Sequence, residues 1–166
     1  MTDGLEQVTF RRAVEADLPA LVALLADDPF GATREVAQDP EDRRYRSAFT
    51  TIDADPAHLL LVADLGGRPV GLLQLTFLQH LTHHGGLRAH VEGVRVASDL
   101  RGSGLGRRMM AHVEELARAR GARMIQLMTD VRREDARRFY ERCGFTATHH
   151  GMKLMLDTPA PPGGTA

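Results

Sequence analysis

Six residues, Arg101-Gly102-Ser103-Gly104-Leu105-Gly106, join an extended segment, 87–96, to a long amphipathic segment that runs to about Arg120. The second segment repeats apolar residues at helical spacing, which predicts a helix, and Gly121 follows it at the usual position of a C-terminal glycine. The short apolar run 124–128 has the character of a buried strand. A strand, a loop with its helix, and a second strand predict one crossover connection and therefore one parallel strand pair.

The rest of the chain predicts a sheet that is otherwise antiparallel. We predict an α/β (α+β) fold, with a mixed, mostly antiparallel sheet of about six to seven strands, one parallel crossover and flanking helices. Residues 1–157 are expected to form a single domain, and 158–166, rich in proline and glycine, a disordered tail. The other expected elements are strands at 8–13, 58–64 and 69–78, helices at 17–26, 41–51 and 134–142, and a last hairpin of 145–148 with 152–156.

Composition limits the classes of function. The 166 residues carry a net charge of −1, which argues against a general binder of nucleic acid or of membrane surfaces. The single cysteine, Cys143, cannot form an intrachain disulfide, and the acidic N-terminus lacks the apolar core of a signal peptide. Both features indicate a cytoplasmic protein. The basic residues are nearly all arginine, with Lys153 as the sole lysine, which is typical of a GC-rich bacterial genome.

A glycine-rich loop between a strand and a helix predicts a site for phosphate or pyrophosphate. Free backbone N–H groups converge there, the helix dipole adds about half a positive charge, and Arg101 adds a cation. A P-loop is excluded because Arg107-Arg108 stand where it requires Lys and Ser or Thr. A dinucleotide-binding fingerprint would require a third glycine at position 107, where this chain has arginine. Asp130, at the end of the following strand, could still take the place of the acid that binds the ribose. The remaining alternative is a glycine-rich loop that only forms a tight turn and binds no ligand.

The loop also resembles the pyrophosphate loop of the GNAT superfamily of N-acetyltransferases. That pattern is Gln or Arg, two residues, Gly, one residue, then Gly or Ala, and Arg101, Gly104 and Gly106 occupy its fixed positions. The resemblance extends from about Val8 to Leu156. Its other segments are Arg11-Arg12-Ala13 with Asp17-Leu18-Pro19, Val91 to Val96, and the Ala-x-x-Phe-Tyr-x-x-x-Gly-Phe segment that starts at Ala136.

The resemblance implies acetyl-CoA as the co-substrate and no metal. In this family the fourth and fifth strands splay apart, and the pantetheine arm lies in the gap like an added strand. Carried over to this chain, the resemblance implies that Val94, Arg95 and Val96 contact that arm. It further implies that the six loop residues hold the pyrophosphate, with Arg107 and Arg108 close to an anion. Many relatives have Asn where Arg133 stands, so the cofactor contact there is altered or lost.

The reaction implied by the resemblance is direct attack of an amine on the thioester. A lysine-like amine has a pKa near 10.4, so only about one molecule in 2,500 is neutral at pH 7 and a general base is useful. Glu92, two residues before Val94, is our candidate for that base. The N–H of Val94 is a candidate oxyanion donor. Tyr140, the tyrosine of the Phe-Tyr segment, would point its hydroxyl at the sulfur and protonate the departing thiolate.

The acceptor is less defined than the cofactor. The expected acceptor is the primary amine of a small molecule, with a protein N-terminus or lysine as the alternative. A non-catalytic acyl-CoA-binding module is a third reading, which Glu92 and Tyr140 together disfavour. Monomer and homodimer both stay open. Histidines near the acceptor side are alternative bases, and their spacing matches no usual zinc set; they are His83, His84, His149 and His150.

Overall fold

The structure is a computed structural model that describes residues 4–27 and 43–156. These residues belong to two compact units, the first ending at Thr129 and the second starting at Asp130. The expected tail, 158–166, lies outside the described residues, and so do the first two positions of the helix expected at 41–51.

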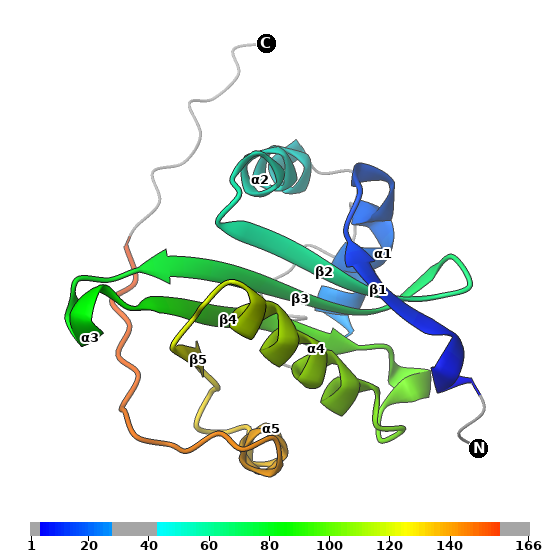
Figure 1. Ribbon diagram of the computed structural model, residues 1–166. Coiled ribbons are helices and arrows are strands. Elements are labelled where there is room, and N and C mark those ends of the chain that lie inside the picture. The colour runs from blue at the N-terminus through cyan, green and yellow to red at the C-terminus, as the bar shows by residue number, and fades with distance from the viewer. Residues whose placement is uncertain (1–3, 28–42, 157–166) are drawn as a thin grey trace. The chain divides into compact units, whose positions relative to one another are not determined.

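The first unit contains a five-stranded sheet whose spatial order follows the chain order (Figure 1). Strands β1 to β4 pair antiparallel, and β4 pairs parallel with β5. The predicted mixed sheet with one parallel crossover is therefore confirmed. The strands are β1 (Val8–Arg12), β2 (His58–Leu65), β3 (Arg68–Gln79), β4 (Leu87–Val96) and β5 (Met124–Leu127).

The strand count is lower than the six to seven predicted. Residues 145–148 and 152–156 are irregular, so the last hairpin is not formed, and Met152 and Leu154 are 92% and 86% exposed. Two strands this short make a marginal hairpin unless a further strand or helix covers their apolar face. The described part of the second unit, 130–156, contains the helix α5 (Glu134–Arg142) and no strand.

One face of the sheet packs against the crossover helix α4 (Leu105–Ala119). Gly71 of β3 lies so close to this helix that a Cβ atom there would come within 2.8 Å of the Met109 sulfur. At the edge of the sheet the Phe10 ring stacks on His112, with 4.8 Å between the ring centroids. The face of α4 that fills this core consists of Leu105, Met109, Met110, Val113 and Ala117, all buried.

The helices α1 (Leu18–Ala26) and α2 (Arg43–Ala54) contact the sheet through β3 and β4 and through β2, respectively (Figure 1). Pro19 stands in the first turn of α1, where its missing N–H costs no helical hydrogen bond. The shorter elements are α3 (Thr82–Gly85) and the 3-10 turns η1 (Leu5–Gln7), η2 (Glu15–Asp17) and η3 (Ser98–Leu100).

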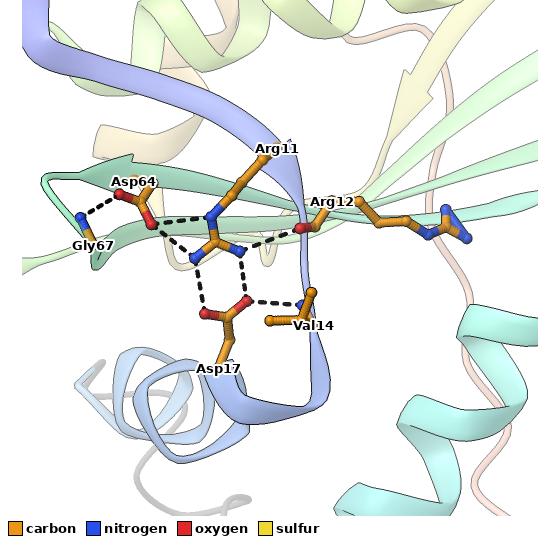
Figure 2. A network of polar contacts seen from close by, with 6 residues as sticks. All are labelled: Arg11, Arg12, Val14, Asp17, Asp64 and Gly67. Carbon is orange, nitrogen blue, oxygen red and sulfur yellow. Dashed lines mark hydrogen bonds and ion pairs between the residues drawn. The ribbon is translucent and has the colours of Figure 1, made fainter.

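An arginine on β1 joins three segments of this unit (Figure 2). The Arg11 guanidinium donates to both oxygens of Asp17 at 2.7 and 2.9 Å, and to Asp64 Oδ2 at 2.7 and 3.0 Å. Asp17 also accepts the Val14 N–H, while Asp64 accepts the Gly67 N–H of the β2–β3 turn. Both carboxylates are buried, and the hydrogen bonds from Arg11 lower the pKa of Asp17.

Replacing Arg11 with methionine should destabilise the domain, because Asp17 and Asp64 would stay buried without their cation. We expect the free energy of unfolding at pH 7 to fall by about 2–3 kcal/mol, slightly below the loss typical of a fully buried pair. The lowered pKa of Asp17 stabilises the folded state above about pH 4, and this contribution is lost as the pH falls through the folded-state pKa. The difference between wild type and variant should therefore shrink below about pH 4.

Urea unfolding followed by circular dichroism, at several pH values, measures both effects. Arg12→Met is the matched control, because Arg12 pairs with Asp53 where both side chains are more than 40% exposed. We expect that variant to lose less than about 1 kcal/mol. Equal losses in the two variants, or a difference for Arg11→Met that does not change with pH, would contradict the account.

Candidate active site

The bulge in β4 shapes the candidate site. Leu72 faces Arg95 and Gln74 faces Glu92, so β4 holds one more residue than β3 over this interval. Such an extra residue is a β-bulge, which bends and twists its strand. Gly93 lies within it at φ 62°, a left-handed conformation that glycine adopts without strain. The bulge therefore redirects β4 immediately after Glu92.

The parallel ladder stops at the same point. β5 pairs with β4 only from Arg88 to Val91, whereas β4 continues to Val96. Within the described part of the first unit, residues 92–96 have no strand neighbour on the β5 side. An extended backbone with an open edge can accept an added strand or a ligand that carries amide groups. β5 ends at Leu127, so the edge of β4 beyond Val91 is open on the β5 side within the described part of the first unit.

Arginine side chains engage two carbonyls of this stretch. The Val94 carbonyl accepts a hydrogen bond from Arg95 Nη1 at 2.9 Å, and the Val96 carbonyl accepts one from Arg101 Nε at 3.2 Å. A carbonyl oxygen has two lone pairs, so each of these groups can still accept a bond from a ligand amide.

The glycine loop presents backbone donors at the start of α4. Gly102 and Gly104 have φ values of 78° and 98°, which only glycine adopts readily. The Ser103 hydroxyl accepts a long hydrogen bond, 3.4 Å, from the Leu105 N–H. Within residues 4–27 and 43–156, the N–H groups of Gly102, Gly104, Gly106 and Arg107 have no recorded acceptor. Free donors at the positive end of a helix are suited to a phosphate.

The three arginines around this loop have different contacts. Arg101 forms an ion pair of 2.9 Å with Asp27, at the end of α1, and therefore ties that helix to the end of β4. Arg108 turns back to the carbonyls of Leu5 and Val8, so its contacts are with the N-terminal segment. Arg107 is exposed and forms no ion pair with any residue that the structure describes. Arg107 is thus the cation of the three that is available to an anion.

Glu92 lies on a polar part of the sheet face opposite α4. Its side chain is 56% exposed, and its Oε1 is 3.7 Å from Nε2 of His90, which is largely buried. His90 faces Thr76 across the strands, and Thr76 Oγ1 lies 3.0 Å from Nδ1 of His58. Sequence reasoning did not single out the contact of His90 with Glu92. The signal was present, because residues two apart on a strand share a face.

Tyr140 belongs to the second unit. Its ring makes edge contacts with Phe139 and Phe145, with centroid distances of 5.0 and 5.9 Å. Arg133 occupies the position before α5, and its N–H bonds to the carbonyl of Asp130. Tyr140 lies in the second unit and Glu92 in the first. That the two side chains act in one reaction is a proposal.

The dinucleotide interpretation loses its support. Asp130, the candidate ribose-binding acid, forms an ion pair of 2.7 Å with Arg132, and the hydrogen bonds of this pair lower the pKa of Asp130. The sheet has a single parallel pair, so it lacks the second parallel half on which a dinucleotide-binding fold depends.

The histidines do not gather into a metal-binding cluster among the residues that the structure describes. His83 and His84 both have left-handed backbone conformations in α3, with φ of 54° and 57°. His149 contacts the Thr148 hydroxyl at 2.7 Å. No described helix is long and apolar enough to span a membrane.

Comparisons with known proteins agree with this geometry. The sequence profile of the Acetyltransferase (GNAT) family matches residues 18–145. Aminoalkylphosphonate N-acetyltransferase of Salmonella typhimurium is 29% identical over 93% of this chain and 95% of its own. Glucosamine 6-phosphate N-acetyltransferase of Trypanosoma brucei brucei is 33% identical over 54% of this chain and 59% of its own. A solved structure from Bacillus halodurans, named a transcriptional regulator, is 45% identical, with a TM-score of 0.87 over 90% of this chain and 99% of that one.

The family match covers most of the chain, including the glycine loop, β4 with its bulge, and the Phe-Tyr segment of α5. The chain therefore belongs to the GNAT acetyltransferase family and is an acetyl-CoA-dependent acyltransferase.

Proposed function

We propose that the protein transfers an acetyl group from acetyl-CoA to the primary amine of a small molecule, by direct attack of the amine on the thioester. The observation that carries the proposal is the open edge of β4 at 92–96, which leads directly into the glycine loop. The names of the relatives from Salmonella and Trypanosoma support a small-molecule acceptor, since both specify a small amine. A single domain over 1–157 and a cytoplasmic location remain our expectations.

The cofactor would bind along this edge and loop. Val94, Arg95 and Val96 would lie beside the pantetheine arm, and the loop from Arg101 to Gly106 would surround the pyrophosphate. The donors would be the free N–H groups of the loop and of the first turn of α4, which are those of Gly102, Gly104, Gly106 and Arg107. Arg107 would add a positive charge, while Arg101 would act mainly by holding β4 to Asp27. When bound, acetyl-CoA supplies the thioester. The protein orients this group and stabilises the charge that develops on its oxygen, with the Val94 N–H as our candidate donor.

Glu92 would remove the proton from the attacking amine, directly or through water. Its position supports this role, because it precedes the bulge at the point where the ladder to β5 has ended. A neutral amine is scarce at pH 7, and without a base its scarcity costs roughly 4.6 kcal/mol of barrier. His90 adjoins Glu92, so it could accept the proton next. The acceptor-side histidines His84 and His150 are the alternative bases.

Tyr140 would act on the leaving group, the thiolate of CoA. A thiolate leaving group benefits from a proton donor, and a tyrosine hydroxyl is protonated at neutral pH. Support for this role comes from the family segment around Tyr140 and from the family match, which extends to Phe145. Its contacts with Phe139 and Phe145 would hold the ring in a fixed orientation.

The name of the Bacillus halodurans structure gives a second candidate role, in regulation. A regulatory protein could use the same strand edge and loop to bind an acyl-CoA without transferring its acyl group. The exposed carboxylate of Glu92, at the start of the open stretch of β4, favours catalysis over binding alone.

Release of CoA thiol from acetyl-CoA distinguishes these roles. We expect turnover with small primary amines, among them amino sugars, and kcat/KM at least tenfold lower with peptides that offer an N-terminus or a lysine. A preference for peptides would overturn the small-molecule assignment. If no amine releases thiol although acetyl-CoA binds in calorimetry, the non-catalytic role would replace the catalytic one.

A pH–rate profile of two variants tests the catalytic pair. Glu92→Gln should lower kcat/KM near pH 7 by about 10²-fold, and the loss should shrink as the pH approaches the pKa of the amine, where neutral amine is abundant. Tyr140→Phe should lower kcat by about 10²-fold, with no such recovery as the pH rises over this range. Acetyl-CoA affinity should change little in either variant.

The two pH–rate profiles test the role of Glu92 and the role of Tyr140 independently. A pH-independent loss in Glu92→Gln would make Glu92 a group that positions the substrate. Unchanged turnover in Glu92→Gln would transfer the base role to a histidine or to water. Unchanged turnover in Tyr140→Phe would make Tyr140 a packing residue.

A further inference from the structure

Arg88 stands on β4 four residues before Glu92, on the same face of the sheet. Its strand neighbour Ala89 is fully buried and, like Val91, points to the opposite face, where α4 packs. Because side chains alternate along a strand, Arg88, His90 and Glu92 lie in a line on the polar face. Arg88 is half-buried in this line.

Only some of the hydrogen-bond donors of the Arg88 guanidinium have an acceptor. Its Nη1 donates to Gln126 Oε1 at 2.7 Å, but its Nε is buried with no acceptor. Of the carboxylates that the structure describes, none forms an ion pair with it. Arg11, another arginine on a partly buried sheet face, holds two carboxylates. A half-buried cation without a carboxylate partner is costly to keep, and an anionic ligand at the guanidinium would supply the missing charge.

The neighbours of Arg88 form a polar lining instead of an apolar core. His58, Thr76, His90 and Gln126 face one another in register across β2, β3, β4 and β5. Side chains opposite one another on adjacent strands have Cβ atoms about 5 Å apart. The row crosses the sheet between Arg88 and Glu92. A polar ligand on this face would therefore meet donors and acceptors between the cation and the proposed base.

We propose that the acceptor carries an anionic oxygen group, such as a phosphonate, phosphate or carboxylate, and that Arg88 binds it. This proposal rests on the proposed function, because the amine is taken to lie at Glu92. The Cα atoms of Arg88 and Glu92 are roughly 13 Å apart along the strand. A direct hydrogen bond at one end and a water-mediated one at the other leave roughly 5 Å between the amine nitrogen and the anion. The substrate class is thus a small amine with an anionic group about four bonds away.

Three amines of matched length test the proposal: 3-aminopropylphosphonate, 4-aminobutyrate and uncharged n-butylamine. Wild type should prefer the anionic amines, and the phosphonate and carboxylate arms show which oxyanion is bound better. Arg88→Gln should lower kcat/KM for the preferred anionic amine by about 10- to 100-fold, and for n-butylamine by less than about twofold. The control is Arg118→Gln, which removes an exposed arginine of α4 and should change neither value.

A binding experiment gives a readout that does not depend on turnover. With CoA present to occupy the cofactor phosphate sites, inorganic phosphate should bind wild type, and Arg88→Gln should weaken its affinity at least tenfold in calorimetry. Equal phosphate binding by the two proteins, or equal loss of kcat/KM with all three amines, would overturn the role of Arg88. If wild type acetylated no amine, the proposed function would fail, whereas the phosphate titration would still decide whether Arg88 binds an anion.

Discussion

Strand β4 has neighbours on both edges only from Arg88 to Val91, and the rest of the candidate site depends on this limit. The bulge around Gly93 bends β4, and the ladder to β5 ends there. A parallel pair requires a crossover, so the chain must leave β4, form α4 and return as β5. The loop that begins α4 therefore starts close to where the open edge of β4 ends. The bulge and the end of β5 thus coincide, and the glycine loop follows the open stretch of β4.

The two faces of the sheet differ in polarity. The face toward α4 is apolar and closely packed, to the point that Gly71 leaves no room for a side chain beside Met109. The opposite face is mixed. It buries Val62 and Leu72 in register with Arg11, which two buried carboxylates hold, and it carries polar groups up to the exposed Glu92. The Arg11 network satisfies its buried charges internally. Arg88 lacks such a partner among the described residues, which is why we interpret it as a ligand-binding group.

Sequence reasoning was most successful where the pattern is local. The spacing of Leu105, Met109 and Val113 and the glycines before them predicted the helix, the loop and hence the parallel pair. The contact of Arg101 with Asp27 could not be read in this way, because 74 positions separate the two residues. The last hairpin was predicted from apolar residues such as Met152 and Leu154, which the structure leaves exposed. Strand formation there needs a partner that local pattern does not reveal. The roles of Glu92 and Tyr140 came from family resemblance, and they remain proposals.

Amide hydrogen exchange, with and without acetyl-CoA, tests most directly whether the cofactor uses the open edge of β4. Our account predicts that exchange slows at least tenfold both in residues 92–96 and in the loop 101–107, because both sets of N–H groups would gain acceptors or be covered. The β2–β3 turn at Gly66 and Gly67 serves as an internal reference and should change little. Protection of the loop without protection of 92–96, or of neither, would contradict the claim that the cofactor lies along β4.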